Sequence, residues 1–287
     1  MYRDKNRINK LIAEYKLDLA DVPIIDPRDP EEDDRREHFG EVFWEKRKRK
    51  GYTLFEAKKI MRERNYFGGM MIETNFADAM ISGITRKYAD PIRAALETIG
   101  VQQGVTRVAG MYILLTRKGP FFLADTTMNI NPSAEDLVEI TALTANCVKQ
   151  FNIVPRIAML SYSNFGSVRG EIPDKLSKAV AILHEKYPGM IVDGDIQANF
   201  ALNNELLKEQ FPFSELINKS VNTLIFPNLV SGNIAYKMMQ ELADVEAIGP
   251  ILLGTKKPAH ILQLGCSVRE IVNMVTIAVI DAQSRGK

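Results

Sequence analysis

The sequence is poor in the residues that build metal sites and disulfide frameworks. Its 287 residues include only two cysteines and three histidines, and no CxxC pair or zinc-ligand spacing occurs among them. We therefore expect no metal site. Two cysteines far apart in the chain, Cys147 and Cys266, are typical of a protein from a reducing compartment. The sequence thus predicts a cytoplasmic protein.

Long apolar runs and an excess of one charge are also missing. No apolar run reaches the ~20 residues that a membrane-spanning helix needs, and the first ten residues, MYRDKNRINK, are charged, unlike a signal peptide. Basic and acidic residues number 37 and 36, so the net charge gives no attraction toward nucleic acid or an anionic membrane. Neither GxGxxG nor GxxxxGK followed by Ser or Thr occurs. We expect no nucleic-acid or membrane partner and find no nucleotide fingerprint.

The second half of the chain alternates short apolar segments with amphipathic ones. Apolar segments at 156–160, 190–196, 222–228 and 247–254 are each followed by a helical pattern, and this alternation predicts an α/β fold with mostly parallel sheets covered on both faces. The length of 287 residues suits one large α/β domain or two lobes. Upstream, we expect a short strand at 22–27, two strands joined by the turn RKGP, and a long helix capped by Asn131.

Ligands of open α/β sheets bind in loops at the carboxyl ends of strands. The loop SYSNFGS, residues 161–167, follows a predicted strand, and its hydroxyls and backbone N–H groups could hold an anion. An ordinary polar turn between a strand and a helix is an equally good interpretation. The loops SGITRKYAD and PNLVSGN occupy comparable positions. Arg86 lies in the first of these loops and Arg93 follows it. Both could bind a phosphate or a carboxylate, or could simply lie on a solvated helix face.

Two aspartates lie two residues apart in the predicted strand MIVDGDI. Asp193 and Asp195 would share one face of that strand and could coordinate a cation, or one of them could cap the next element. No third ligand is near them in the sequence.

The stretch AHILQLGCSVREIVNM combines a histidine, a cysteine and a serine. Ser267 and Glu270 have the spacing of a capping box, which makes Ser267 the start of a helix, and the apolar residues that follow predict a buried helix. The position of Cys266 just before this helix could lower its thiol pKa. A pair of Cys266 with His260 is a possible nucleophile and base, although the sequence does not place the two side chains together.

Several stretches together resemble the phosphate acetyltransferase family. They are RIAMLSYSNFGS, VDGDIQANFAL, NTLIFPNLVSGNIAYKMMQ, ADTTMNINPSAEDLVEI and IGPILLGTKKPAHILQLGCSVREIVNMVTIAV. The motifs SNFGS, NIAYK and VREIVNM are most similar to the phosphate acetyltransferase-like C-terminal domain of hybrid NADP-dependent malic enzymes. The resemblance implies that the chain is a C-terminal part of a longer malic enzyme, and that NADP and a divalent metal belong only to the module absent here.

The resemblance also implies an architecture and ligands. We expect two α/β lobes of the isocitrate dehydrogenase type with a cleft between them, one formed by residues 1–134 plus 252–287 and the other by 135–251. We expect a homodimer or higher homo-oligomer that binds acetyl-CoA or CoA and phosphate-like anions. The residues expected to bind these ligands are Arg86, Arg93, Ser161, Ser163, Asn164, Gly166, Ser167, Asn228, Asn233 and Lys237.

The catalytic motif of the family is altered in this sequence. The family reads roughly NDLSRGCS, and its serine and arginine bind phosphate and assist attack by CoA; the matching residues here are Gln263 and Leu264. Glu270 keeps an acidic residue of the motif, and Arg93 matches an arginine of the family's LRP segment. The resemblance therefore implies a catalytically impaired module that binds acetyl-CoA and regulates malate decarboxylation. The alternatives are an active phosphate acetyltransferase, in which Arg86, Arg93 and the SYSNFGS donors hold phosphate, and a purely structural dimerisation module.

Overall fold

The computed structural model describes residues 5–19, 21–85, 88–243 and 245–285. Contacts within the chain define two compact units. Unit 1 comprises Met1–Asp78 and Asp90–Ile99, and unit 2 comprises Ala79–Ala89 and Gly100–Lys287.

Unit 1 is helical. Its elements are α1 (Lys5–Glu14), η1 (Pro30–Glu32), α2 (Asp33–Arg47), η2 (Lys48–Lys50), α3 (Leu54–Ile60), α4 (Arg64–Glu73) and most of α5 (Ala89–Thr98). Aromatic and methionine side chains, including Phe39, Phe43, Phe67 and Met70, form its core. The strand expected at 22–27 is wrong, because this segment forms no strand and its chain passes directly into η1.

Unit 2 contains all the strands of the described chain. Its elements are β1 (Met80–Gly83), β2 (Ala109–Thr116), β3 (Gly119–Ala124), α6 (Ala134–Gln150), β4 (Arg156–Leu160), α7 (Glu171–Lys186), β5 (Ile191–Ile196), α8 (Ala198–Ala201), α9 (Asn204–Gln210), β6 (Thr223–Ile225), α10 (Leu229–Ala243), β7 (Glu246–Leu253), β8 (Ala259–Leu262) and α11 (Val268–Arg285).

One six-stranded sheet organises unit 2. Its strand order is β5-β4-β6-β3-β2-β7, and β1 and β8 form a separate parallel pair. Within the large sheet only β2 runs antiparallel to its neighbours. The α/β fold with mostly parallel strands is thus confirmed.

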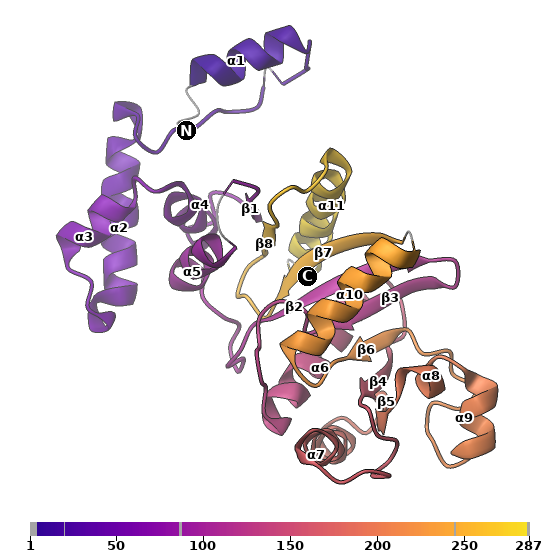
Figure 1. The fold of residues 1–287 in the computed structure, drawn as a ribbon. Helices are drawn as coiled ribbons and strands as arrows, with labels where there is room; N and C mark the ends of the chain where they lie inside the picture. The colour runs from indigo at the N-terminus through magenta and orange to yellow at the C-terminus, as the bar shows by residue number, and fades with distance from the viewer. Residues whose placement is uncertain (1–4, 20, 86–87, 244, 286–287) are drawn as a thin grey trace. The chain divides into compact units, whose positions relative to one another are not determined.

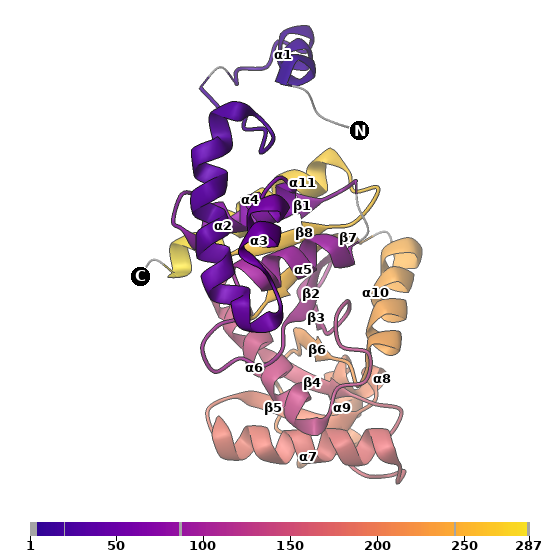
Figure 2. The same ribbon diagram turned by 90° about the vertical axis from the view of Figure 1, so that its left-hand side faces the viewer.

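Alternate residues of the central strands enter two different cores. On β2, Met111 and Ile113 pack into one apolar cluster and Tyr112 and Leu114 into another, so both faces of the sheet are buried. Helices α6, α7 and α11 contribute to the first cluster, and α10 contributes Tyr236 to the second. Figure 1 shows α10 in orange crossing β2 and β3, and Figure 2 shows α7 alongside β4 and β5. This double coverage leaves the two edges where strands begin and end as the places open to ligands.

The compact units differ in their bounds from the two lobes expected from the family resemblance. Strands β2 and β3 lie in the expected first lobe, 1–134 plus 252–287, yet β3 pairs with β6 of the expected second lobe, 135–251. Ladder hydrogen bonds therefore hold these strands in unit 2. The lobe division itself stays a prediction.

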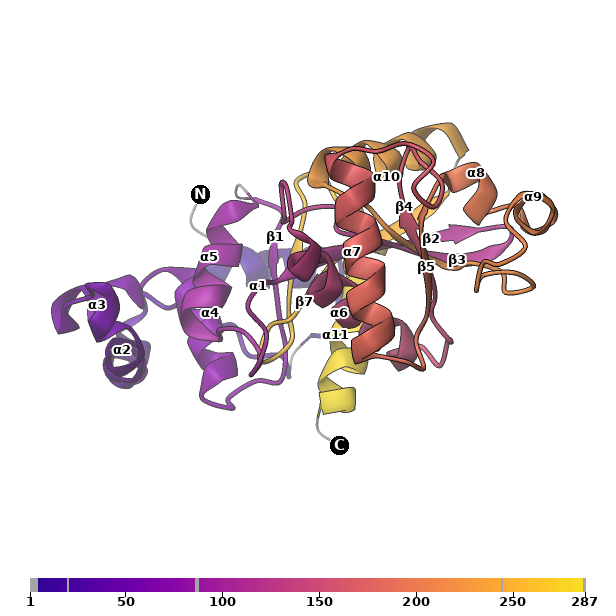
Figure 3. The same cartoon turned by 90° about the horizontal axis from the view of Figure 1, so that it is seen from below.

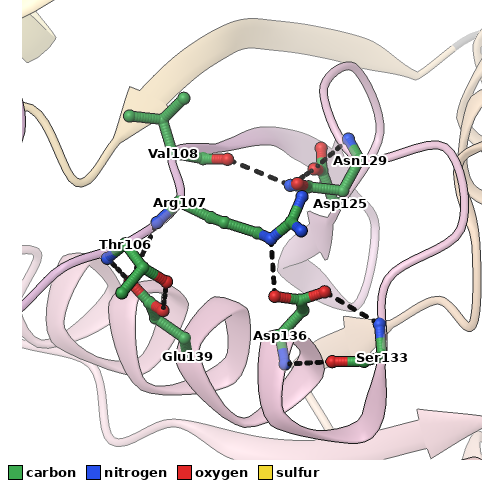
Figure 4. Close-up of polar contacts among 8 residues, drawn as sticks. All are labelled: Thr106, Arg107, Val108, Asp125, Asn129, Ser133, Asp136 and Glu139. Carbon is green, nitrogen blue, oxygen red and sulfur yellow. Dashed lines mark hydrogen bonds and ion pairs between the residues drawn. The ribbon is translucent and has the colours of Figure 1, made fainter.

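Three boundary or burial predictions need correction. Helix α6 is capped by Ser133 and not by Asn131, since Ser133 Oγ accepts a hydrogen bond from Asp136 N at 3.1 Å and Asp136 Oδ2 accepts one from Ser133 N at 2.9 Å (Figure 4). Helix α10 begins at Leu229, so Asn233 lies inside a helix and not in a loop. Helix α11 is not fully buried, because its residues Val268, Val272, Val275 and Val279 are exposed.

None of the described helices is both long and apolar enough to cross a lipid bilayer.

Candidate functional site at the carboxyl edge of the sheet

The carboxyl ends of β3, β4, β5, β6 and β7 lie at one edge of the sheet, because these strands are mutually parallel. The segments that leave this edge are rich in hydroxyl, amide and carboxylate side chains. This is the edge at which α/β proteins bind their ligands.

The loop after β4 satisfies most of its own polar groups. Ser163 is fully buried, its Oγ accepts a hydrogen bond from Val168 N at 3.1 Å, and it lies 3.3 Å from Ser167 Oγ. Ser167 Oγ accepts from Asn164 N at 3.0 Å, and Ser161 Oγ accepts from Ser163 N at 3.2 Å. These contacts form a compact turn. Binding of a ligand by its five expected residues stays a prediction.

The same loop is fastened to the neighbouring strand β5. Asn164 Oδ1 accepts a hydrogen bond from Gln197 N at 2.8 Å, and Asp195 Oδ1 accepts one from Gly166 N at 3.1 Å. The carboxylate of Asp193 instead accepts from Ser214 Oγ at 2.7 Å. The two aspartates thus bind different segments, and a cation held by both of them stays a prediction. Within the described residues, no cluster of three or more potential metal ligands occurs.

The loop after β3 is built around a buried carboxylate, Asp125, which sequence reasoning missed. Its Oδ1 accepts hydrogen bonds from the N–H groups of Gly110 at 3.0 Å, Thr127 at 2.9 Å and Met128 at 3.1 Å. Its Oδ2 accepts from the N–H of Asn129 at 2.8 Å and from the Asn129 side chain, which also donates to Val108 O (Figure 4). Four backbone donors on one carboxylate fix the path of this loop.

Helix α10 begins against this loop. Asn228 Oδ1 caps the helix by accepting from Ser231 N at 3.0 Å, and Asn233 Nδ2 donates to Thr126 O at 3.1 Å. Gly232 permits this approach, because a Cβ atom there would collide with the backbone carbonyl of Asp125. The structure therefore brings Asn228 and Asn233 to the loop after β3, as their assignment to one site requires.

Two stacked tyrosines connect α10 with the segment after β8. The rings of Tyr112 and Tyr236 lie 4.1 Å apart with an interplanar angle of 15°, and Gln263 Nε2 lies 3.5 Å from the Tyr236 hydroxyl. Lys237 Nζ lies 5.5 Å from the centre of the Tyr236 ring. Burial, followed by the Tyr236 hydroxyl and more distantly Glu270, raises the pKa of Tyr112. The structure thus brings Lys237 and Gln263 to a tyrosine pair that sequence reasoning missed.

Two further buried hydroxyls at this edge make no hydrogen bond of normal geometry within the described chain. They belong to Tyr88 and Thr127. Burial raises the pKa of Tyr88, and the neighbouring Thr127 hydroxyl acts in the opposite direction. Buried hydroxyls without partners are costly, so both offer donors to the oxygen atoms of a ligand.

The segment after β8 ends in a helix cap and not in a nucleophile. Ser267 Oγ accepts from Glu270 N at 3.2 Å and Glu270 Oε2 accepts from Ser267 N at 2.6 Å, which confirms the capping box. Leu264, at the position of the family's arginine, is 65% exposed. Burial and the Glu270 carboxylate raise the pKa of Cys266, so the expected lowering is wrong.

His260 does not serve as a base for Cys266. Its side chain is fully buried on β8, and Nε2 lies 3.6 Å from Asp281 Oδ2 of α11. Burial lowers the pKa of His260 to about 4, although Asp281 acts in the opposite direction. The histidine is therefore neutral near pH 7 and part of the packing of β8, which removes the proposed cysteine and histidine pair.

Neither of the two arginines expected to bind phosphate can be assigned to this edge from the structure. Arg93 is an exposed residue of α5 in unit 1. Arg86 lies outside the described residues. Phosphate binding by either residue stays a prediction.

Comparison with known proteins agrees with this fold. The family model described as phosphate acetyl/butaryl transferase matches residues 1–279. A phosphate acetyltransferase of Clostridium acetobutylicum is 35% identical over 98% of this chain and 85% of its own length. An NADP-dependent malic enzyme of Haemophilus influenzae is 36% identical over 92% of this chain, which spans only 34% of that enzyme.

Solved structures give the same result. A phosphotransacetylase from Streptococcus pyogenes superposes with a TM-score of 0.87 at 34% identity, covering 98% of this chain and 85% of the other. Sequence and structure thus agree over almost the whole chain. The chain therefore belongs to the phosphate acetyl/butaryl transferase family.

Proposed function

We propose that this protein binds CoA or acetyl-CoA together with phosphate and transfers an acetyl group between them. The observation that supports this most strongly is the family match over residues 1–279, together with relatives named phosphate acetyltransferase that are 35% identical over nearly the whole chain. A cytoplasmic location is part of the same proposal.

The reaction makes definite demands on the site. The sulfur of CoA attacks the carbonyl carbon of acetyl phosphate, the bond from that carbon to the phosphate oxygen breaks, and phosphate leaves while the thiol proton passes to a base. Negative charge develops on the carbonyl oxygen and on the leaving phosphate, so hydrogen-bond donors and cations must be placed there. Tyr88, Thr127 and Lys237 are the donors that we assign to this role at the carboxyl edge.

A second function is favoured by one specific observation. Position 264 holds an exposed leucine, which can donate no hydrogen bond to a phosphate, and position 263 holds a glutamine whose amide lies near Tyr236. Loss of one such donor typically lowers a rate by a factor of roughly 10² to 10³. Under this second proposal the chain binds acetyl-CoA without efficient turnover and regulates an NADP-dependent malic enzyme module in the same polypeptide. The malic enzyme of Haemophilus influenzae supports it.

One experiment separates the two. Formation of acetyl-CoA from acetyl phosphate and CoA is followed by thioester absorbance for the wild type and for Leu264→Arg. The matched control is Leu54→Arg, which makes the same change at an exposed leucine of α3. Acetyl-CoA binding is measured by calorimetry in parallel. Turnover by the wild type supports acetyl transfer. Acetyl-CoA binding without turnover refutes acetyl transfer and supports the regulatory function; neither binding nor turnover supports a structural role alone.

We also propose that the chain forms a homodimer or a higher homo-oligomer. Helix α10 exposes Val230, Ile234, Met238 and Leu242 at intervals of four residues. Helix α11 exposes Val268, Val272, Val275 and Val279. Contiguous apolar surface of this kind is typical of contact surfaces between proteins. A monomer mass by light scattering at micromolar concentration would contradict this proposal.

A further inference from the structure

A cavity lies at the opposite edge of the six-stranded sheet, where its parallel strands begin. It has a volume of about 810 Å³ and is bordered by the turn between β2 and β3, by the beginnings of β4 and β6, and by the segment that enters β7. All its lining residues belong to unit 2. Figures 1 and 3 show the turn between β2 and β3 and helix α9 on the same side of the sheet, and α9 supplies one wall of the cavity. Since strands begin here, the cavity is distinct from the loops at the carboxyl edge.

The inner wall of this cavity is apolar. Its side chains include Phe121 on β3, Leu207 on α9, Leu216, Leu224 on β6 and Met239 on α10. Leu207 and Leu216 are almost fully buried and form the floor of the cavity. A volume of 300–1,000 Å³ with mostly apolar walls is typical of small-molecule sites.

The rim of the same cavity is rich in positive charge. Arg117, Lys118, Arg156 and Lys219 line it, and none of the described lining residues is an aspartate or a glutamate. Across the part of the chain that the structure describes, no carboxylate lies within ion-pair distance of any of these four residues. Four cations around one cavity contrast with a net charge of +1 for the whole chain.

One of the four cations is held in place by the backbone. Arg156 donates from Nε to Ser220 O and from a terminal nitrogen to Val154 O at 3.4 Å. The side chains of Arg117, Lys118 and Lys219 are on exposed residues and can turn toward a ligand. Like charges gathered at the mouth of an apolar cavity repel one another and focus a positive potential into it. An anion at the rim would relieve that repulsion.

We propose that this cavity is a binding site for an anionic amphiphile, a molecule with an apolar body and a phosphate or carboxylate group at one end. The apolar body occupies the floor lined by Phe121, Leu207 and Leu216, and the anionic group lies among the four cations. The site does not depend on acetyl transfer, because none of its lining residues belongs to the loops of the carboxyl edge. Binding here does not compete with acetyl-CoA at that edge.

Calorimetry on the whole chain tests the proposal with octyl phosphate, kept below its micelle concentration. Octanol and inorganic phosphate supply the apolar and anionic halves separately. We expect octyl phosphate to bind at least ~10-fold more tightly than either half, because it uses both the floor and the rim. Equal affinity for octanol and octyl phosphate, or no binding of octyl phosphate, would overturn the proposal.

Variants locate the site. The double variant Arg117→Glu with Lys219→Glu reverses two exposed rim charges, and we expect it to weaken octyl phosphate binding at least ~10-fold. The matched control is Lys149→Glu with Lys186→Glu, which makes the same change in net charge at exposed positions outside this cavity. Equal weakening in the control would overturn the assignment.

A third variant tests the apolar wall. Leu202→Glu places a carboxylate on a partly exposed leucine of the lining and is expected to weaken octyl phosphate binding without loss of the folded state. Displacement of octyl phosphate by acetyl-CoA would place it at the carboxyl edge instead and would contradict the proposal.

Discussion

The loops after β3 and after β8 are constructed by different means. The loop after β3 surrounds the buried carboxylate of Asp125, which accepts four backbone hydrogen bonds. The segment after β8 has no such centre; it is bounded by the neutral, buried His260 on one side and by the Ser267 cap on the other, with Leu264 exposed between them. Hydrogen bonds to a buried carboxylate fix the path of the loop after β3, whereas the segment after β8 is fixed only by the residues at its two ends.

This difference explains where sequence change can be tolerated. Replacing a residue in the loop after β3 disturbs hydrogen bonds that have no alternative partner. An exposed side chain such as Leu264 can change with little effect on folding, since surface substitutions usually alter stability by less than about 0.5 kcal/mol. The chemistry of the segment after β8 is thus free to vary while the scaffold stays intact.

The largest effect on stability is expected for Asp125→Ala. The change leaves four backbone N–H groups without their acceptor in a buried loop, and each such group costs roughly 1–3 kcal/mol. We expect the free energy of unfolding, measured by urea denaturation, to fall by at least about 4 kcal/mol.

The matched control is Glu139→Ala. Glu139 also accepts from two backbone N–H groups, those of Thr106 and Arg107, but at a half-buried position that water can reach (Figure 4). Its loss is expected to cost about 1 kcal/mol or less. Equal losses for the two variants would show that burial of the Asp125 loop is not what stabilises it.

A smaller effect is expected from protonation of His260. Its folded pKa of about 4 lies below the ordinary 6.5, so the unfolded chain binds the proton more readily and stability falls as the pH falls from about 6.5 to about 4. A difference of this size corresponds to roughly 3 kcal/mol. We expect His260→Gln to reduce the slope of unfolding free energy against pH in that window.

The exposed His38 provides the control for this titration. His38→Gln makes the same change at an exposed position, and only His260→Gln is expected to reduce the slope. If His260→Gln retains the wild-type slope, other groups account for the acid sensitivity.

The smallest effect is expected for Ser267→Ala. Removal of a capping hydroxyl costs about 1 kcal/mol, and Thr53→Ala, which breaks the same kind of capping box on α3, should cost a similar amount. Urea denaturation gives both values. A loss of acetyl phosphate turnover in Ser267→Ala but not in Thr53→Ala would show that Ser267 also contacts the ligand.

Much of the fold could be predicted from local patterns. The apolar segment at 156–160 is strand β4, and the segment at 222–228 contains the shorter strand β6, Thr223–Ile225. Both strands are buried on both faces, and such strands show continuous apolar runs that are easy to recognise. Helix ends were harder. Asn131 and Ser133 are both good caps, and only the reciprocal hydrogen bonds with Asp136 select Ser133. The exposed valines of α11 were missed because an apolar surface awaiting a partner has the same composition as a buried one.

The site could be predicted less completely. The strand-end loops were found by their hydroxyls and amides, yet in the loop after β4 many of those groups bind one another, which spacing alone does not reveal. Asp125 could not be recognised from the sequence, because a lone aspartate after a strand forms no distinctive pattern. The pairing of Tyr112 with Tyr236 joins residues 124 positions apart, so only the tertiary structure brings them together.

The pairing of β7 with β2 has a consequence for the chain while it is being synthesised. Strand β2 ends at Thr116, whereas its partner β7 begins at Glu246, so one side of β2 remains an open edge while the intervening chain is synthesised. Open edges attract other strands. During that interval the nascent sheet depends on β3 alone to cover β2, and a ribosome stalled before Glu246 would leave a chain prone to association through that edge.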